Sequence, residues 1–387
     1  MPEHNPAEFA SGLSAKLAAR SRHVCVFLGA GVGASCRLPD VDTLQTEVLE
    51  SLEGTTKNAM ASQLGARNLE AALSRLRRIA ALIDDDQTVD GLTGAAAADL
   101  DKAVCHAIVK SLEIDEADLA PVKLFAAWAG RAAYDLPLEV FTVSYDLLLE
   151  TAFEDRRVPY FDGFVGSLEG AFQTQLVECA PADRDWVPSF FLRLWKLHGS
   201  VNWARRDDGR VVRLGHPVPE GLAAAIYPSD MKYDESRRVP FVVLADRLRR
   251  SLHQPETLTL VAGYSFGDNH LNEVIFDAAS RCERSETIVF CYADIPSHLA
   301  DYAVASPNLQ VVSPEEAILG GIRAGWKTPD DPPPDLWENN SFSLGDFRRL
   351  AAYLARSTAR EQEPNAALTP RLGQAIQKPG AHDKAPE

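Results

Sequence analysis

Four short segments place glycine, serine, carboxylate or imidazole groups directly after apolar runs. In chain order they are Gly29-Ala30-Gly31, Ser144-Tyr145-Asp146, His198-Gly199-Ser200 and Gly263-Tyr264-Ser265-Phe266-Gly267-Asp268. An apolar run that ends abruptly in this way is typical of a buried strand of a parallel sheet, whose carboxyl end faces a ligand crevice. Imidazole and carboxylate groups at such ends can transfer protons. The pattern therefore predicts a ligand site where several strands end.

The first of these segments follows the apolar run 24–28 and suggests which ligand the site takes. Glycine lets the backbone bend sharply and approach a phosphate, because no Cβ stands in the way. The pattern is an incomplete G-x-G-x-x-G, with Gly29, Gly31 and then Ala34, and the chain has no G-x-x-x-x-G-K-[ST]. A nucleotide site is the first hypothesis, and a tight turn with no ligand is the alternative.

The four segments, together with Arg37-Leu38-Pro39-Asp40, resemble the sirtuin (Sir2-like) NAD-consuming domain over about residues 20 to 320. The likeness is strongest to its bacterial antiphage-defence branch. Members of that branch tend to carry a Tyr-Asp pair, a Leu-His-Gly-Ser-x-x-Trp segment and a Gly-Tyr-Ser-Phe-x-Asp segment. The resemblance implies that NAD is the substrate and that its nicotinamide–ribose bond is broken. With water as acceptor the outcome is NAD hydrolysis, and with an acyl-lysine it is deacylation.

His198 is the candidate general base. It ends a probable strand over 194–197 and precedes a glycine, and an imidazole with an ordinary pKa near 6.5 suits proton transfer at cellular pH. A hydrogen-bonded structural histidine is the alternative, and the match to the Leu-His-Gly-Ser segment favours the base.

Asp146 and Ser144 are the other candidate catalytic residues. The resemblance places Asp146 near the nicotinamide ribose, whereas the sequence alone also fits a cap for a helix over 147–153. Family members normally carry Asn where this chain has Ser144. Serine offers one hydroxyl on a shorter arm, while Asn offers an acceptor and two donors. This substitution fits either catalysis through a bridging water or a domain that binds NAD without turnover.

The resemblance also implies which residues bind the rest of NAD. Gly29, Ala30 and Gly31 would line the diphosphate, and Asp40 would lie on the loop that covers the nicotinamide end, unless it is a turn or cap residue. The usual Phe and Arg of that loop are missing here. The second turn supplies the remaining predicted contacts, Gly263, Ser265 and Asp268. Asp268 either reaches the adenosine or caps the next helix.

Composition narrows the classes of function. Hydrophobic residues make up 46% and charged residues 24% of the 387, as in globular proteins. The net charge of −16 argues against strong direct nucleic-acid binding, which needs clustered Lys and Arg. The short basic runs 75–78 and 247–250 are interpreted as solvated helix faces. If the protein acts on DNA, we expect a partner protein to bind the DNA.

The cysteines argue against a zinc module. Six are scattered along the chain, at positions 25, 36, 105, 179, 282 and 291, and no C-x-x-C pair occurs. Deacylating sirtuins usually hold a zinc ion with two such pairs, so no metal is expected here. The missing pairs also make protein deacylation a less favoured function. The polar amino terminus and the lack of about 18 consecutive apolar residues predict a cytoplasmic protein with reduced thiols and no membrane span.

The elements that must position these groups follow an α/β order. Strand-like runs at 24–28, 138–143, 192–197, 258–261, 287–291 and 309–312 predict a Rossmann-like parallel sheet with helices on both faces. We expect an amino-terminal helix in 1–22 and a sirtuin-like domain over 23–325, with a helical insertion at about 43–135. A carboxy-terminal segment over 326–356 with a short helix and a disordered tail over 357–387 complete the prediction, and 160–192 and 204–235 are expected to be irregular.

The sequence leaves three functions open. The leading hypothesis is an NAD glycohydrolase that acts as an antiphage effector. The second is a non-catalytic NAD- or nucleotide-binding scaffold in a complex with a HerA-like hexameric ATPase. A short Argonaute-type protein is the other partner that the resemblance suggests, and a homo-oligomer is also expected. The third and least favoured is an NAD-dependent protein deacylase.

Overall fold

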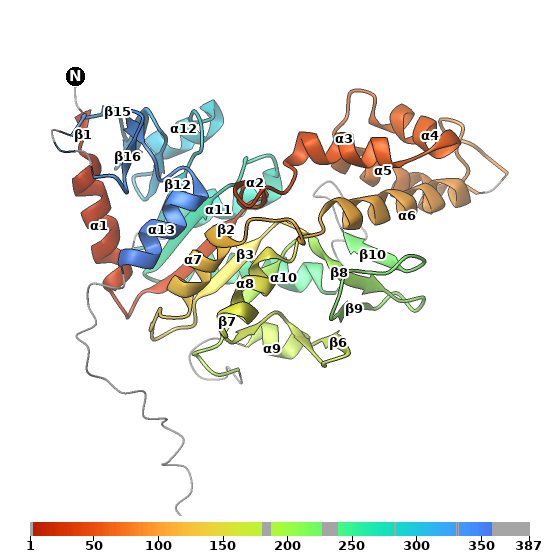
Figure 1. The fold of residues 1–387 in the computed structure, drawn as a ribbon, viewed down its shortest axis with the longest axis horizontal. Helices are drawn as coiled ribbons and strands as arrows, with labels where there is room; N and C mark the ends of the chain where they lie inside the picture. Colours follow the sequence, from red (N-terminus) through yellow and green to blue (C-terminus); the bar gives the residue numbers. More distant parts are fainter. Residues whose placement is uncertain are drawn as a thin grey trace, which may run out of the picture.

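The computed structural model describes residues 3–84, 86–179, 187–226, 239–281, 284–329, 331 and 333–357. A ten-stranded sheet in the order β1-β15-β14-β13-β12-β11-β2-β3-β7-β4 forms its centre (Figure 1). The strands from β13 to β4 pair in parallel, whereas β14 pairs antiparallel with both of its neighbours. The predicted Rossmann-like parallel sheet is confirmed.

The parallel strands coincide with the predicted apolar runs. They are β2 (His23–Leu28), β3 (Glu139–Thr142), β7 (Leu192–Lys196), β11 (Thr257–Ala262), β12 (Glu286–Phe290) and β13 (Leu309–Val312), with a short β4 (Tyr160–Phe161) at the edge. Every residue of β2, β3, β7 and β11 is buried. Because these strands are covered on both faces, even their polar residues, such as Glu139, Arg193 and Lys196, are buried.

Helices cover both faces of the sheet, as predicted. One face packs against α1 (Pro6–Ala18), α7 (Ala120–Ala129), α8 (Leu148–Asp155) and α13 (Phe347–Ser357). The other packs against α10 (Phe241–Leu252), α11 (Asn269–Arg281) and α12 (Ser297–Ala305). Strand β2 shows the division: Val24, Val26 and Leu28 lie in the first core, and Cys25 and Phe27 lie in the second.

The helical block between β2 and β3 divides into two groups. Helices α3 (Val41–Ser51), α4 (Gly54–Leu64), α5 (Leu69–Leu82) and α6 (Gly94–Ser111) share a hydrophobic core of their own and project together to one side of the sheet (Figure 1). Helix α7 instead contributes Phe125 and Trp128 to the core of the sheet. The short α2 (Gly31–Ser35) connects β2 to this block.

A second, five-stranded sheet lies where the sequence suggests irregular structure. Its order is β10-β8-β9-β6-β5, from β5 (Phe164–Val165), β6 (Glu169–Phe172), β8 (Gly199–Arg205), β9 (Val211–Leu214) and β10 (Ala223–Ile226), and the short α9 (Thr174–Glu178) follows β6. The expectation of irregular structure over 160–192 and 204–235 was therefore wrong for β5, β6, β9 and β10, while β8 lies mostly between these two ranges. The strands are two to seven residues long and antiparallel, so they lack the long apolar run that identifies a buried parallel strand.

The two ends of the described chain meet the far edge of the main sheet. Strand β1 (Glu3–His4) pairs with β15 (Ile322–Trp326), which follows β14 (Glu316–Leu319). A small ribbon of β16 (Trp337–Glu338) and β17 (Ser341–Phe342) precedes α13. The tail predicted to be disordered lies, from residue 358 on, outside the described residues. In the described part, no helix is long and apolar enough to cross a membrane.

Candidate functional site

A cavity of about 960 Å³ opens where β2, β3, β7 and β11 end. Strand β2 connects onward to β3 on one side and lies against β11 on the other, and such a switch in strand order is where α/β sheets bind ligands. All predicted site residues except Gly29 line it: Ala30, Gly31, Asp40, Ser144, Asp146, His198, Gly263, Ser265 and Asp268.

The two glycine turns pack directly against each other. The amide of Gly29 donates to the carbonyl oxygen of Ala262 and that of Gly31 to the carbonyl oxygen of Gly263, both at 2.9 Å. A Cβ on Gly29 would lie 2.2 Å from the oxygen of Gly263, and one on Gly31 would lie 2.9 Å from it. The close approach of two backbones thus requires these glycines, and the Gly29 and Gly31 amides are already engaged within the protein. Contact of these residues with a diphosphate stays a prediction.

The close packing of the two turns predicts that a larger residue at Gly29 destabilises the protein. We expect Gly29→Ala to destabilise the protein by about 1–3 kcal/mol, because the added methyl meets backbone that cannot move aside easily. Gly12→Ala in α1 is the matched control, since a Cβ there meets nothing within 4 Å and alanine favours a helix. Urea unfolding measures both, and equal stability of the two variants would contradict the prediction.

Ser144 and Asp146 form one hydrogen-bonded unit in the loop after β3. The hydroxyl of Ser144 donates to Oδ2 of Asp146, and the other carboxylate oxygen accepts from the amide of Leu148 at 2.9 Å. Asp146 thus accepts from the first amide of α8, in line with one of the sequence-based interpretations, and it is buried and lines the cavity. Because the proton of the Ser144 hydroxyl is directed at Asp146, the lone pairs of that oxygen remain acceptors.

A buried lysine fixes the loop that carries this unit. Nζ of Lys196, at the end of β7, donates to the carbonyl oxygens of Tyr145 and Asp146 and to Oε1 of Glu150 at 2.9 Å. The Lys196 side chain is 2% exposed, so its charge relies on these three acceptors. The contact ties the loop after β3 to the strand that leads to His198.

His198 lines the cavity and contacts Asp268. Its Nε2 is 3.3 Å from Oδ2 of Asp268, and the two side chains are 12% and 10% exposed. The chain can turn after His198 because Gly199 adopts a φ of +90°, and a Cβ there would lie 2.0 Å from the carbonyl oxygen of Ala225. The sequence identified both residues but held no sign that they meet, since they lie 70 positions apart along the chain.

Asp268 is held at the start of α11. Its Oδ1 accepts from the amides of His270 and Leu271 at 2.9 and 3.3 Å, so the cap that the sequence suggested is present. Burial acts to raise the pKa of Asp268, but the contact with His198 and these amides outweigh it and lower the pKa. The carboxylate is thus kept ionised beside the imidazole.

The remaining predicted residues lie at the rim of the cavity. Asp40 is exposed and caps α3 by accepting from the amide of Thr43 at 2.8 Å, and the hydroxyl and the amide of Thr43 together lower the pKa of Asp40. Ser265 is exposed on the second turn. The second turn is stabilised by two hydrogen bonds to Asn272. The hydroxyl of Tyr264 donates to Oδ1 of Asn272 at 2.9 Å, and the side-chain amide of Asn272 donates to the carbonyl oxygen of Phe266.

Sequence reasoning missed the contributions of the insertion and of the carboxy-terminal segment. Leu69, Glu70 and Leu73 of α5 line one wall, and Gly345, Asp346 and Phe347 line another. The segment can approach this closely because a Cβ on Gly345 would lie 2.0 Å from the carbonyl oxygen of Cys291. The described lining residues include no lysine or arginine and carry these carboxylates: Asp40, Glu70, Asp146, Asp268, Asp294 and Asp346.

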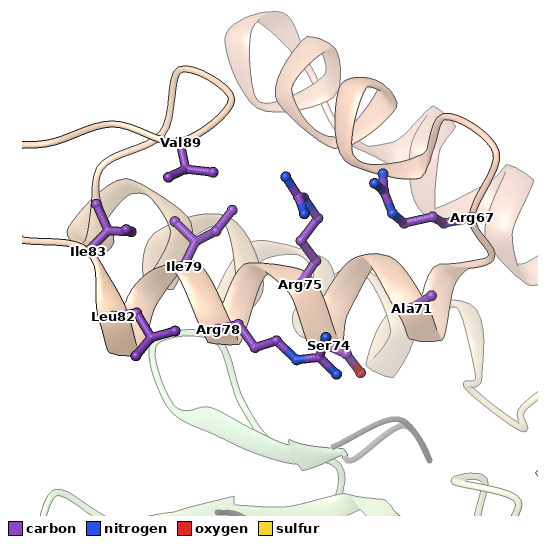
Figure 2. Close-up of a pocket in the computed structure, with 9 residues that line it drawn as sticks. All are labelled: Arg67, Ala71, Ser74, Arg75, Arg78, Ile79, Leu82, Ile83 and Val89. Atoms are coloured by element: carbon purple, nitrogen blue, oxygen red, sulfur yellow. The ribbon is translucent and has the colours of Figure 1, made fainter. Parts of the chain in front are cut away.

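A separate groove of about 430 Å³ lies on another face of α5 (Figure 2). Arg67, Arg75 and Arg78 line it together with Ile79 and the exposed Leu82, and Arg75 pairs with Asp90 at 2.5 Å. No predicted site residue reaches this groove. The candidate site is therefore the cavity at the strand ends.

A buried polar cluster lies at the opposite, amino-terminal ends of the strands. Ligand atoms of His23, Cys25 and Glu139 lie within 4.8 Å of one another, as in a metal site. The carboxylate of Glu139, however, already accepts from Arg247, Trp195, Ser251 and His23 at 2.7 to 3.0 Å. These contacts are those of a charge network. The solvated helix face interpreted for 247–250 is thus wrong for Arg247, which is 5% exposed.

Comparison with known proteins matches a part of the chain that contributes to this site. Residues 138–312 match the family model of the SIR2-like domain. The match runs from the start of β3 to the end of β13, so it includes Ser144, Asp146, His198 and Asp268 but not the first glycine turn. A search of curated proteins found no match.

Proposed function

We propose that this protein, which carries a SIR2-like domain, hydrolyses NAD by breaking the bond between nicotinamide and C1′ of its ribose. SIR2-like domains use NAD. The observation that carries the proposal is the convergence of His198, Ser144 and Asp146 on one cavity that also receives both glycine turns. A volume of about 960 Å³ is within the range of cofactor-sized sites.

The charge of the cavity suits this reaction. The nicotinamide ring of NAD is cationic, and positive charge moves onto the ribose as the bond to C1′ breaks. Fixed carboxylates in a cavity that excludes much of the water stabilise such charge. The lining supplies Asp146 next to Ser144 and Asp268 next to His198, with no lysine or arginine among the described lining residues to oppose them.

Each catalytic residue then has a definite role. Asp146, fixed by Ser144 and by the amide of Leu148, accepts a hydrogen bond from a ribose hydroxyl and holds the sugar. His198 takes the proton from the attacking water. Ser144 offers its lone pairs to the ribose or to that water.

Nicotinamide release from NAD tests the proposal directly. The purified chain is incubated with NAD alone and with the product of the neighbouring gene, because effectors of this kind are held inactive until a signal arrives. We expect release in at least the second condition. No release in either condition would reject the proposal.

Ser144→Asn gives a second test, at the position where this chain departs from the sirtuin pattern. We expect the variant to raise kcat about 3- to 10-fold, the equivalent of one more hydrogen bond worth about 0.5–1.5 kcal/mol. Ser144→Ala, which loses the hydroxyl, is expected to lower kcat. An unchanged rate in both variants would remove Ser144 from the mechanism.

We further propose that the protein acts in antiphage defence as a subunit of a complex. A HerA-like hexameric ATPase is the favoured partner and a short Argonaute-type protein the second. The net charge of −16 supports a division of labour in which another chain contacts DNA. The projecting insertion supports this as well, since it offers a surface for assembly. Co-purification and light scattering test the complex and the homo-oligomer expected within it.

A non-catalytic NAD-binding subunit is the second candidate. The observation that favours it is the engagement of the Ser144 hydroxyl with Asp146, which leaves that side chain without a donor for the attacking water. Calorimetry that detects NAD or ADP-ribose binding, with nicotinamide released only by Ser144→Asn, would establish it. Deacylation ranks third, and turnover of an acetylated peptide would bring it forward.

A further inference from the structure

We propose that Asp268 is a positioning residue that holds the proton of His198 on Nε2 and so makes Nδ1 the atom that acts as base. The inference rests on the proposed function, in which His198 takes a proton, and goes beyond it by assigning the reacting nitrogen. It concerns a carboxylate for which the sequence suggested only an adenosine contact or a helix cap.

The proximity of the pair carries the first step. Oδ2 of Asp268 lies 3.3 Å from Nε2 of His198, and both side chains are largely shielded from water. A neutral imidazole carries its proton on one nitrogen only, and the partner of each nitrogen decides which. An ionised carboxylate accepts hydrogen bonds and cannot donate them. It therefore favours the form of His198 that has hydrogen on Nε2.

Asp268 is itself fixed, which is what a positioning residue needs. Its second oxygen accepts from the amides of His270 and Leu271, at the amino-terminal end of the thirteen-residue helix α11. The partial positive charge of a helix amino terminus keeps a carboxylate ionised there. Asp268 thus stays an acceptor and cannot turn away from His198 without losing its cap contacts.

The other ring nitrogen is left for chemistry. Within the described part of the chain, Asp268 is the one polar partner of the His198 ring, and the residue lines the cavity. With Nε2 protonated, Nδ1 carries the lone pair. Apo active sites often hold such a nitrogen without a partner until substrate binds.

The proposed step balances as follows. The oxygen of water forms a bond to C1′ while the bond from C1′ to nicotinamide breaks, and that electron pair returns to the ring nitrogen of nicotinamide. One water proton moves to Nδ1 of His198. The resulting imidazolium has hydrogen on both nitrogens, and its charge faces the Asp268 carboxylate. The products are nicotinamide, ADP-ribose and one proton, which His198 later releases.

Asp268→Asn is the variant that tests the assignment. Asparagine caps helices as well as aspartate does, so folding is expected to survive. It has lost the charge, and its amide can offer either an oxygen or a nitrogen to His198. We expect kcat to fall about 10- to 100-fold, as for other partners that orient a reacting group, with KM nearly unchanged. Asp268→Ala, which also loses the cap, separates this effect from stability.

Nitrogen NMR of the imidazole tests the inference without enzyme turnover, because it measures which ring nitrogen carries the hydrogen. The full chain is labelled with ¹⁵N-histidine, and a His198→Gln sample identifies the His198 signals. In the neutral ring of the wild type we expect hydrogen on Nε2 and a bare Nδ1, whereas Asp268→Asn should show a mixture or the reverse. Hydrogen on Nδ1 in the wild type, or the same form in both proteins, would overturn the assignment. Failure of the proposed function would appear separately, as absent nicotinamide release.

Discussion

His198→Ala is expected to lower the rate of nicotinamide release about 10²- to 10⁴-fold, the range that a positioned general base contributes. In the structure the ring lines the cavity, with Asp268 at 3.3 Å on one side and the Ser144–Asp146 unit lining the same space. Alanine removes the group that takes the proton but leaves the strands that frame the site. We therefore expect kcat to fall while NAD still binds.

The measurement follows nicotinamide release and NAD binding in parallel. His216→Ala serves as the control, because His216 is exposed in a loop and contacts only the carbonyl oxygen of Pro217 among the described residues. Wild-type turnover in His198→Ala would show that another group is the base. Loss of binding together with turnover would instead give His198 a role in holding NAD.

Much of this site could be predicted because parallel strands end at one edge of their sheet. The buried runs that precede Gly29, Ser144, His198 and Gly263 form adjacent strands, so their following residues reach one cavity. The predicted helix caps at Asp146 and Asp268 are also present, since a cap depends on residues two or three positions away. Local rules suffice for such features.

Features that depend on distant packing could not be predicted. No local rule brings Asp268 to His198, or places Glu70 and Asp346 on the cavity wall, because each comes from an element whose position is set by tertiary contacts. The sequence suggested that the glycines of the first turn allow a phosphate to approach. The structure shows a different reason for glycine at position 29, which is its close packing against Gly263. The small antiparallel sheet was missed because its strands are short, two to seven residues each.

Arg247 shows the same limit for charge. Its run of four residues looks like a solvated helix face, and Arg249 and Arg250 do pair with Asp246 on the surface. Arg247 instead points into the protein, where Nε and Nη2 bind both oxygens of Glu139 at 2.8 and 2.9 Å. A buried arginine is tolerable only with such a partner, and that partner lies 108 positions away, at the start of β3.

Glu139→Ala is accordingly expected to destabilise the protein by about 3–5 kcal/mol, because it leaves the charge of Arg247 buried and unpaired. Glu139 is fully buried and accepts from residues on β2, β7 and α10. The matched control is Glu338→Ala, whose pair with Arg349 is exposed on both sides, and a loss of at most about 1 kcal/mol is expected there.

The pH of the measurement follows from the pKa values of the network. Burial opposes the charge of Glu139, but Arg247 and His23 outweigh it and lower its pKa, so its contribution is complete above the unfolded pKa of about 4.3 and lost as the pH falls. The pKa of His23 is raised to about 10, against burial, by its contacts with Cys25 and Glu139. That contribution is complete below the unfolded pKa of about 6.5 and lost as the pH rises towards 10.

Urea unfolding at about pH 5.5 therefore measures the stability with both contributions complete. If Glu139→Ala lowers the free energy of unfolding by less than about 1 kcal/mol, the charge network adds little to stability. The consequence is expected to reach the candidate site through the sheet. Glu139 joins the strands β2, β3 and β7, because it starts β3 and accepts from His23 at the start of β2 and from Trp195 near the end of β7. The same strands carry the glycine turn, Ser144 and His198 at their carboxyl ends. A variant that disrupts these contacts should also lower affinity for NAD, although no residue of the network lines the cavity in the described structure.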